Sequence, residues 1–124
     1  MTVVEELMNR DRIFCANSQT NKTAAWKDVM LPTTIMGTGG THPYIVGWDA
    51  IAPGLEQMYQ LDSLVFHWEP VHAFVSEDAT LGVTTGTYVR EFLQNKELNK
   101  RQGKYMTVWK KVDQTWYAVF DMGN

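Results

Sequence analysis

The sequence "GKYMTVWKKVDQTWYAVFDMGN" (Gly103–Asn124) is the most informative segment for the fold. It is the most aromatic part of the chain, although a polar, fraying tail is usual at a chain end. Residues 103–112 and 115–122 are rich in β-branched and aromatic side chains, which favour strands. A turn at Val112-Asp113-Gln114, with its two polar residues, joins the two runs. The segment therefore predicts two consecutive strands, with Asp121 close to the last residue.

Two more runs of the same kind precede this segment, at residues 63–76 and 80–92. Pro70 interrupts the first run and marks a bulge or a sheet edge, since proline cannot donate to a ladder. Shorter extended pieces are expected at Thr33–Met36 and Tyr44–Val46, on either side of a glycine-rich bend.

Helical periodicity occupies the first half of the chain instead. It predicts helices over residues 2–20, 22–30 and 48–61, the second capped by Thr20 or Asn21 and ended by Pro32. Pro53 is compatible with the third helix only if that helix starts near Asp49–Ala52. Helices followed by four long strands predict an α+β fold with the helices on one face of an antiparallel sheet.

The composition indicates one globular domain, residues 1–124, with 44% hydrophobic residues and a net charge of −3. That charge balance argues against nucleic-acid binding. No apolar run is long enough for a membrane span, and the acidic start does not resemble a signal peptide, so we expect a cytoplasmic protein. The single Cys15 is expected to be a buried thiol. No metal-ligand spacing and no cofactor motif occurs, so we expect neither group.

The chain resembles the NTF2-like superfamily, the cone fold of ketosteroid isomerase, scytalone dehydratase and SnoaL-type cyclases, and within it the SnoaL-like/DUF4440 group. The resemblance is carried by "IVGWDAI" (residues 45–51), "HWEPVHAFVSEDATLGVTTGTY" (residues 67–88) and the C-terminal segment. It implies three helices on a strongly curved antiparallel sheet whose last strands are central. One sheet face would enclose a pocket for a small apolar or aromatic molecule, and the other would pack on a second subunit.

Strand alternation divides residues 104–110 between these two faces. Tyr105, Thr107 and Trp109 share one side, and we assign them to the dimer interface, where aromatic residues are enriched. The reverse assignment would exchange pocket and interface residues. The pocket is then predicted to be lined by Trp26, Met30, Ile35, Tyr44, Met58, Trp68, Glu69, Tyr88, Met106, Val108 and Phe120. The same side chains could equally form a filled core.

The resemblance to ketosteroid isomerase does not extend to its catalytic groups. The general base aligns with Gly37 or Thr38, the oxyanion tyrosine with Phe14 and the protonated aspartate with Met106, and none of these can do that chemistry. The isomerase mechanism is therefore not expected here.

Asp121, His67 and His42 remain as candidates for catalysis. Asp121, between Phe120 and Met122, is expected to be partly desolvated and to have a raised pKa, although it could instead cap backbone groups. His67 and Glu69 would share a strand face and could hold a water molecule, or simply be a polar surface pair. His42 could lie at the mouth of the cone or be an ordinary loop residue.

We therefore hypothesise a homodimer that binds a small apolar or aromatic molecule. If the protein is an enzyme, we expect cofactor-free acid–base catalysis of the isomerase, dehydratase or cyclase type. The alternative is a non-catalytic homodimeric binding or scaffolding module that uses the same sheet.

Overall fold

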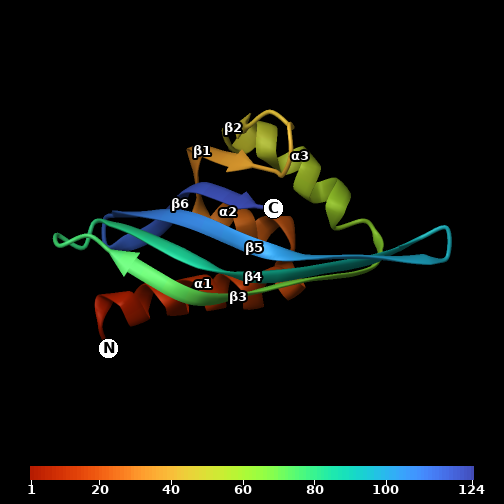
Figure 1. The fold of residues 1–124 in the computed structure, drawn as a ribbon. Helices are drawn as coiled ribbons and strands as arrows, with labels where there is room; N and C mark the ends of the chain where they lie inside the picture. The colour runs from red at the N-terminus through yellow and green to blue at the C-terminus, as the bar shows by residue number, and fades with distance from the viewer.

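The computed structural model describes residues 1–124 and shows three helices packed against one six-stranded sheet (Figure 1). The helices are α1 (Val3–Asn21), α2 (Thr23–Val29) and α3 (Trp48–Met58). The strands are β1 (Met30–Gly37), β2 (Ile45–Val46), β3 (Asp62–Val75), β4 (Leu81–Gln94), β5 (Glu97–Val112) and β6 (Thr115–Gly123). This arrangement confirms the predicted α+β class.

The sheet has the strand order β2-β1-β6-β5-β4-β3, so β6 lies between β5 and β1 (Figure 1). The C-terminal strand is therefore central, as the resemblance implied. The long strands β3 to β6 form successive antiparallel pairs, and β3, β4 and β5 bend along their length. Pro70 lies in the edge strand β3 at a register shift, which confirms the predicted bulge.

The pairing of β1 with β6 differs from expectation because it is parallel. The strand also begins at Met30, so Pro32 lies inside it at a register shift between Met30 and Ile35. The Thr34 side chain bridges this irregularity: its hydroxyl accepts from the Leu31 N–H at 2.9 Å and donates to the Ala118 carbonyl at 2.6 Å. A side chain here supplies hydrogen bonds that the interrupted ladder lacks.

The helix ends agree only in part with the sequence prediction. A capping box starts α1, in which the Thr2 hydroxyl accepts from the Glu5 N–H and the Glu5 carboxylate accepts from the Thr2 N–H. The predicted caps of α2 are wrong, because Lys22 occupies that position with φ of 54° and no side-chain cap. Pro53 lies inside α3, which begins at Trp48, and it is exposed on the solvent side of the helix.

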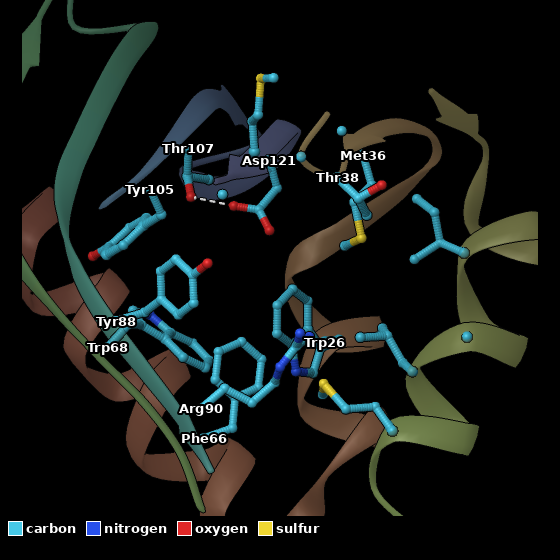
Figure 2. Close-up of a pocket in the computed structure, with 18 of the residues that line it drawn as sticks. Trp26, Met36, Thr38, Phe66, Trp68, Tyr88, Arg90, Tyr105, Thr107 and Asp121 are labelled. Carbon is cyan, nitrogen blue, oxygen red and sulfur yellow. Dashed lines mark hydrogen bonds between the residues drawn. The ribbon is translucent and has the colours of Figure 1, made fainter. Parts of the chain in front are cut away.

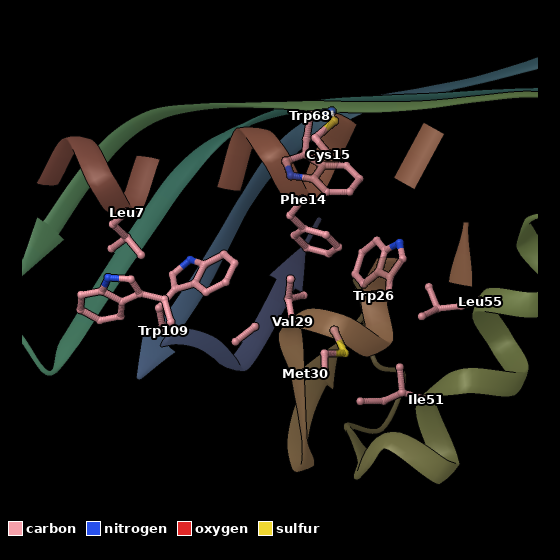
Figure 3. Packing of buried hydrophobic residues seen from close by; sticks show 12 residues of the cluster. Leu7, Phe14, Cys15, Trp26, Val29, Met30, Ile51, Leu55, Trp68 and Trp109 are labelled. Atoms are coloured by element: carbon pink, nitrogen blue, oxygen red, sulfur yellow. Dashed lines mark hydrogen bonds between the residues drawn. The ribbon is translucent and has the colours of Figure 1, made fainter. Parts of the chain in front are cut away.

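The core lies between α1, α2 and α3 and the sheet face that they cover (Figure 3). Trp109 on β5 is fully buried, packs edge-on against Phe14 with ring centroids 6.4 Å apart, and donates from Nε1 to the Thr84 hydroxyl at 2.9 Å. Helix α1 approaches β4 so closely that a Cβ at Gly82 would lie 2.5 Å from the Leu7 side chain. Cys15 is buried and free, as predicted.

This core corrects the assignment of the two sheet faces. Tyr105, Thr107 and Trp109 lie on the helix-covered face and not at an outer interface, while Met106 and Val108 face the other way. The packing of the helices determines which face of the sheet is buried, because Phe14 of α1 and Trp26 of α2 pack on that face. Both alternation sets of β5 contain apolar residues, so the pattern alone fits either face.

Candidate functional site

A cavity of about 270 Å³ lies between the helix-covered face of the sheet and the helices (Figure 2). Its walls are mostly apolar and come from all three helices, from β1 and β2, and from β3 to β6. Apolar walls with a few polar groups are typical of small-molecule sites, whose volumes run from about 300 Å³ upward. The cavity is thus suited to a ligand of modest size.

Asp121 of β6 is a carboxyl group in the wall of this cavity. It lies opposite Thr107 of β5, whose hydroxyl donates to Asp121 Oδ1 at 2.7 Å (Figure 2). Desolvation raises the pKa of Asp121 to about 6, the negative charge of Asp11 adds to this, and the hydrogen bond from Thr107 opposes it. The predicted upward shift of the pKa is confirmed.

A second carboxyl group, Asp11 of α1, lies behind the cavity wall and is 1% exposed. It accepts hydrogen bonds from Trp68 Nε1 at 2.9 Å and from the Tyr105 hydroxyl at 2.7 Å. Burial raises the pKa of Asp11, and these hydrogen bonds counteract the shift. Burial and the neighbouring Asp11 also raise the pKa of Tyr105 above its usual value, so its hydroxyl stays protonated. The network fixes two aromatic walls of the cavity.

Asp11 was not among the residues that the sequence analysis proposed for the site. The signal was present, because Leu7, Asp11 and Phe14 are spaced by four and three residues and so share a helix face. A carboxylate on a core-facing stripe needs buried hydrogen-bond donors. Trp and Tyr side chains on facing strands are such donors.

Of the residues predicted to line a pocket, Trp26, Met58, Trp68 and Tyr88 lie in the wall of this cavity. The seven others lie outside that wall. Met30 is buried in the core, and Glu69 is exposed and pairs with Arg12 of α1 at 3.2 Å. The remaining five are Ile35, Tyr44, Met106, Val108 and Phe120. Tyr105 and Thr107, predicted at an interface, line the cavity instead.

Neither His67 nor His42 lies with Asp121 in the cavity wall. His67 is exposed, because its neighbours Phe66 and Trp68 line the cavity and strand alternation turns His67 away. His42 is exposed in the bend before β2. The structure therefore does not bring these two catalytic candidates to Asp121, and the carboxyl group faces the cavity without a histidine.

The positions that align with the catalytic groups of ketosteroid isomerase lie partly in the cavity wall and partly on the outer face of the sheet. Phe14, Gly37 and Thr38 line the cavity, whereas Met106 lies on the opposite face of the sheet. Two cations in the wall, Arg90 of β4 and Arg101 of β5, were not predicted. Arg90 shares a face of β4 with Tyr88, and Arg101 shares a face of β5 with Tyr105, because alternate residues of a strand point to the same side. Their place in the cavity wall can be predicted only once the correct face is known to be the buried one.

The sequence matches no protein-family model and no curated protein. Its structure is similar to many solved ones. An NTF2-like protein with a cystatin-like fold from Novosphingobium aromaticivorans has a TM-score of 0.78 at 14% identity, over 96% of this chain and 79% of that one. A ketosteroid isomerase-like protein from Erwinia carotovora has a TM-score of 0.78 at 11% identity, over 98% and 92%.

The hub homology domain of CaMKII from Chlamydomonas reinhardtii is similar as well, with a TM-score of 0.72 at 14% identity, over 100% of this chain and 98% of that one. At such identities the likeness concerns the fold. The chain thus has the NTF2-like cone fold that the sequence predicted. None of the three helices combines the length and apolar character needed to cross a membrane.

Proposed function

We propose that this chain, with its NTF2-like cone fold, binds a small molecule in the cavity and that Asp121 transfers a proton to or from it. The observation that carries this proposal is a carboxyl group with a pKa of about 6 in an otherwise mostly apolar wall. A general base works best when its pKa lies near the working pH. A ketosteroid isomerase-like protein among the structural neighbours supports acid–base chemistry as a function of this fold.

The proposed step is removal of a proton from a carbon next to a carbonyl group by the Asp121 carboxylate. The electron pair of the C–H bond passes to the carbonyl group and forms an enolate, while the proton resides on Asp121. Exchange results when Asp121 swaps this proton with solvent before one returns to the same carbon, and isomerisation results when the proton returns to another atom of the ligand. Thr107 holds one carboxyl oxygen at 2.7 Å and leaves the other directed at the cavity (Figure 2). The carboxyl group is the base in this transfer, and the prediction of cofactor-free chemistry is part of this proposal.

The proposal is tested with 2-tetralone, a neutral aromatic ketone with acidic C–H bonds, by following deuterium incorporation in D₂O by NMR. The rate above the buffer blank should rise with pH through about 6 and then level off, because only ionised Asp121 accepts a proton. A wild-type protein that gives no exchange above the blank would contradict the acid–base function. A rate that falls as pH rises would contradict the role of Asp121 as base.

A second candidate function is oligomerisation through the outer face of the sheet, because apolar side chains are exposed there. Met106 is 39% exposed and Tyr44 is 60% exposed, and the Tyr44 ring lies 6.0 Å from that of Phe120. Contiguous apolar surface is typical of subunit interfaces. We propose a homodimer through this face, and a hub homology domain among the structural neighbours supports an assembling role.

Met106→Glu should weaken this dimer, because it places a charge in an apolar contact. By multi-angle light scattering, wild type is expected at about twice the monomer mass of 14.2 kDa, and the variant at 14.2 kDa. Ala16→Glu, at an exposed position of α1, is the matched control and should stay dimeric. A monomeric wild type, or an undisturbed Met106→Glu dimer, would show that this face is not the interface.

A further inference from the structure

Arg90 and Arg101 lie directly opposite each other in the β4–β5 ladder, and both side chains line the cavity. Like charges at directly opposed positions of one sheet face repel each other. The next pair in the ladder, Glu91 and Lys100, faces the other side and is complementary, with an N–O distance of 3.4 Å. The repulsive pair is thus confined to the cavity side.

The guanidinium of Arg90 also lacks a partner within the protein. Its Nε atom is buried and makes no hydrogen bond, and neither Arg90 nor Arg101 forms an ion pair. Neither carboxyl group of this region pairs with the arginines: Asp11 accepts hydrogen bonds from Trp68 and Tyr105, and Asp121, across the cavity, accepts one from Thr107 and forms no ion pair. A buried N–H donor without a hydrogen-bond partner is unfavourable for the fold unless something else pairs with it.

The surroundings of Arg90 indicate the rest of the ligand. Arg90 extends from β4 toward Phe66 and Trp26, whose rings are stacked with centroids 6.1 Å apart (Figure 2). Asp121 lies on the other side of the cavity in the same view. A ligand held at one end by the arginines would therefore place its body between aromatic walls and its far end toward Asp121.

We propose that the cavity binds a small aromatic carboxylate whose carboxylate group pairs with Arg90 and Arg101. The planar forks of two guanidinium groups match the two oxygens of a carboxylate and can bind it in a bidentate manner. The proposal deepens the proposed function by naming its ligand class, and it uses the same cavity without relying on Asp121. It also changes the expected ligand from a purely apolar one to one with an acidic end.

The experiment uses three acids, each paired with its neutral amide: benzoate, cinnamate and 2-naphthoate. Binding to the full chain is followed by tryptophan fluorescence, because Trp26 and Trp68 line the cavity. At least one acid should bind about tenfold or more tightly than its amide, as expected for a charge-assisted pair. Arg90→Gln should abolish this preference, and Arg101→Gln, at an exposed side chain, should reduce it.

Lys100→Gln, a neighbouring cation on the opposite face, is the matched control and should keep the preference. Without ligand, Arg90→Gln should unfold at the same temperature as wild type or a higher one, because it removes an unpaired cation. Equal affinities for acids and amides, no saturable binding of any acid, or a preference that survives in Arg101→Gln and Arg90→Gln would each overturn the proposal. Asp121→Asn should retain acid binding, so loss of proton exchange and loss of anion recognition are separable results.

Discussion

Asp121→Asn is expected to lower the protein-dependent exchange of 2-tetralone about 10²- to 10⁴-fold, the usual contribution of a general base. Asparagine has nearly the same shape and can still accept the hydrogen bond from Thr107, but it cannot take up a proton. Deuterium incorporation measured by NMR at about pH 7.5 gives the rate, well above the pKa of about 6. Asp113→Asn, in the exposed turn before β6, should leave the rate unchanged.

The same variant should separate a catalytic role from a structural one through its stability. The folded pKa of Asp121 is raised from 3.8 to about 6, so the folded state binds this proton more tightly than the unfolded state. Wild-type stability should therefore fall by up to about 3 kcal/mol as pH rises from below 4 through 6, at about 1.4 kcal/mol per pKa unit. Asparagine does not ionise, and the variant should lack this loss.

Urea denaturation at about pH 4 and about pH 7.5 measures the difference. We expect Asp121→Asn to match wild type at the lower pH and to be at least as stable at the higher one. A variant that is strongly destabilised at both values would assign Asp121 to the fold. A stable variant with unchanged exchange would remove Asp121 from the chemistry.

Trp109→Ala is expected to reduce the free energy of unfolding by about 3–5 kcal/mol, as for other large aromatic residues truncated in a core. Trp109 is fully buried beside Phe14, and its loss would also leave the Thr84 hydroxyl without the indole donor. The measurement is urea unfolding of both proteins followed by circular dichroism. Phe74→Ala, at an aromatic residue that is 67% exposed, is the control and should change stability by about 0.5 kcal/mol or less.

This prediction also tests the face assignment of the sheet. If Trp109 lay at a subunit interface, its truncation would give a folded monomer, and stability would depend on protein concentration. Burial in the core instead predicts destabilisation at every protein concentration. A folded variant within about 1 kcal/mol of wild type would contradict the packing in Figure 3.

The order and type of the main elements could be predicted from the amino-acid sequence. The runs over β3 to β6 combine β-branched and aromatic residues with polar turns, and the 3.6-residue periodicity identifies α1 and α3. These signals are local, since each depends on neighbouring residues of one segment. The raised pKa of Asp121 was also predictable, and its main cause is desolvation of the carboxyl group in the cavity wall.

Which face of the sheet is buried could not be predicted from the sequence, because it depends on how the helices pack. Alternation along β5 separates Tyr105, Thr107 and Trp109 from Met106 and Val108, but both sets are apolar enough for a core. The choice is made when α1 and α2 pack on one side, and it determines at once that Tyr105 lines the cavity and that His67 does not.

The same long-range packing decided the polar groups of the site. Asp11 meets Trp68 across 57 residues and Tyr105 across 94 residues, and Arg90 faces Arg101 only through the register of the β4–β5 ladder. Local sequence specifies which side chains can ionise or donate. Their partners, their desolvation and therefore their pKa values arise only when distant segments exclude water together.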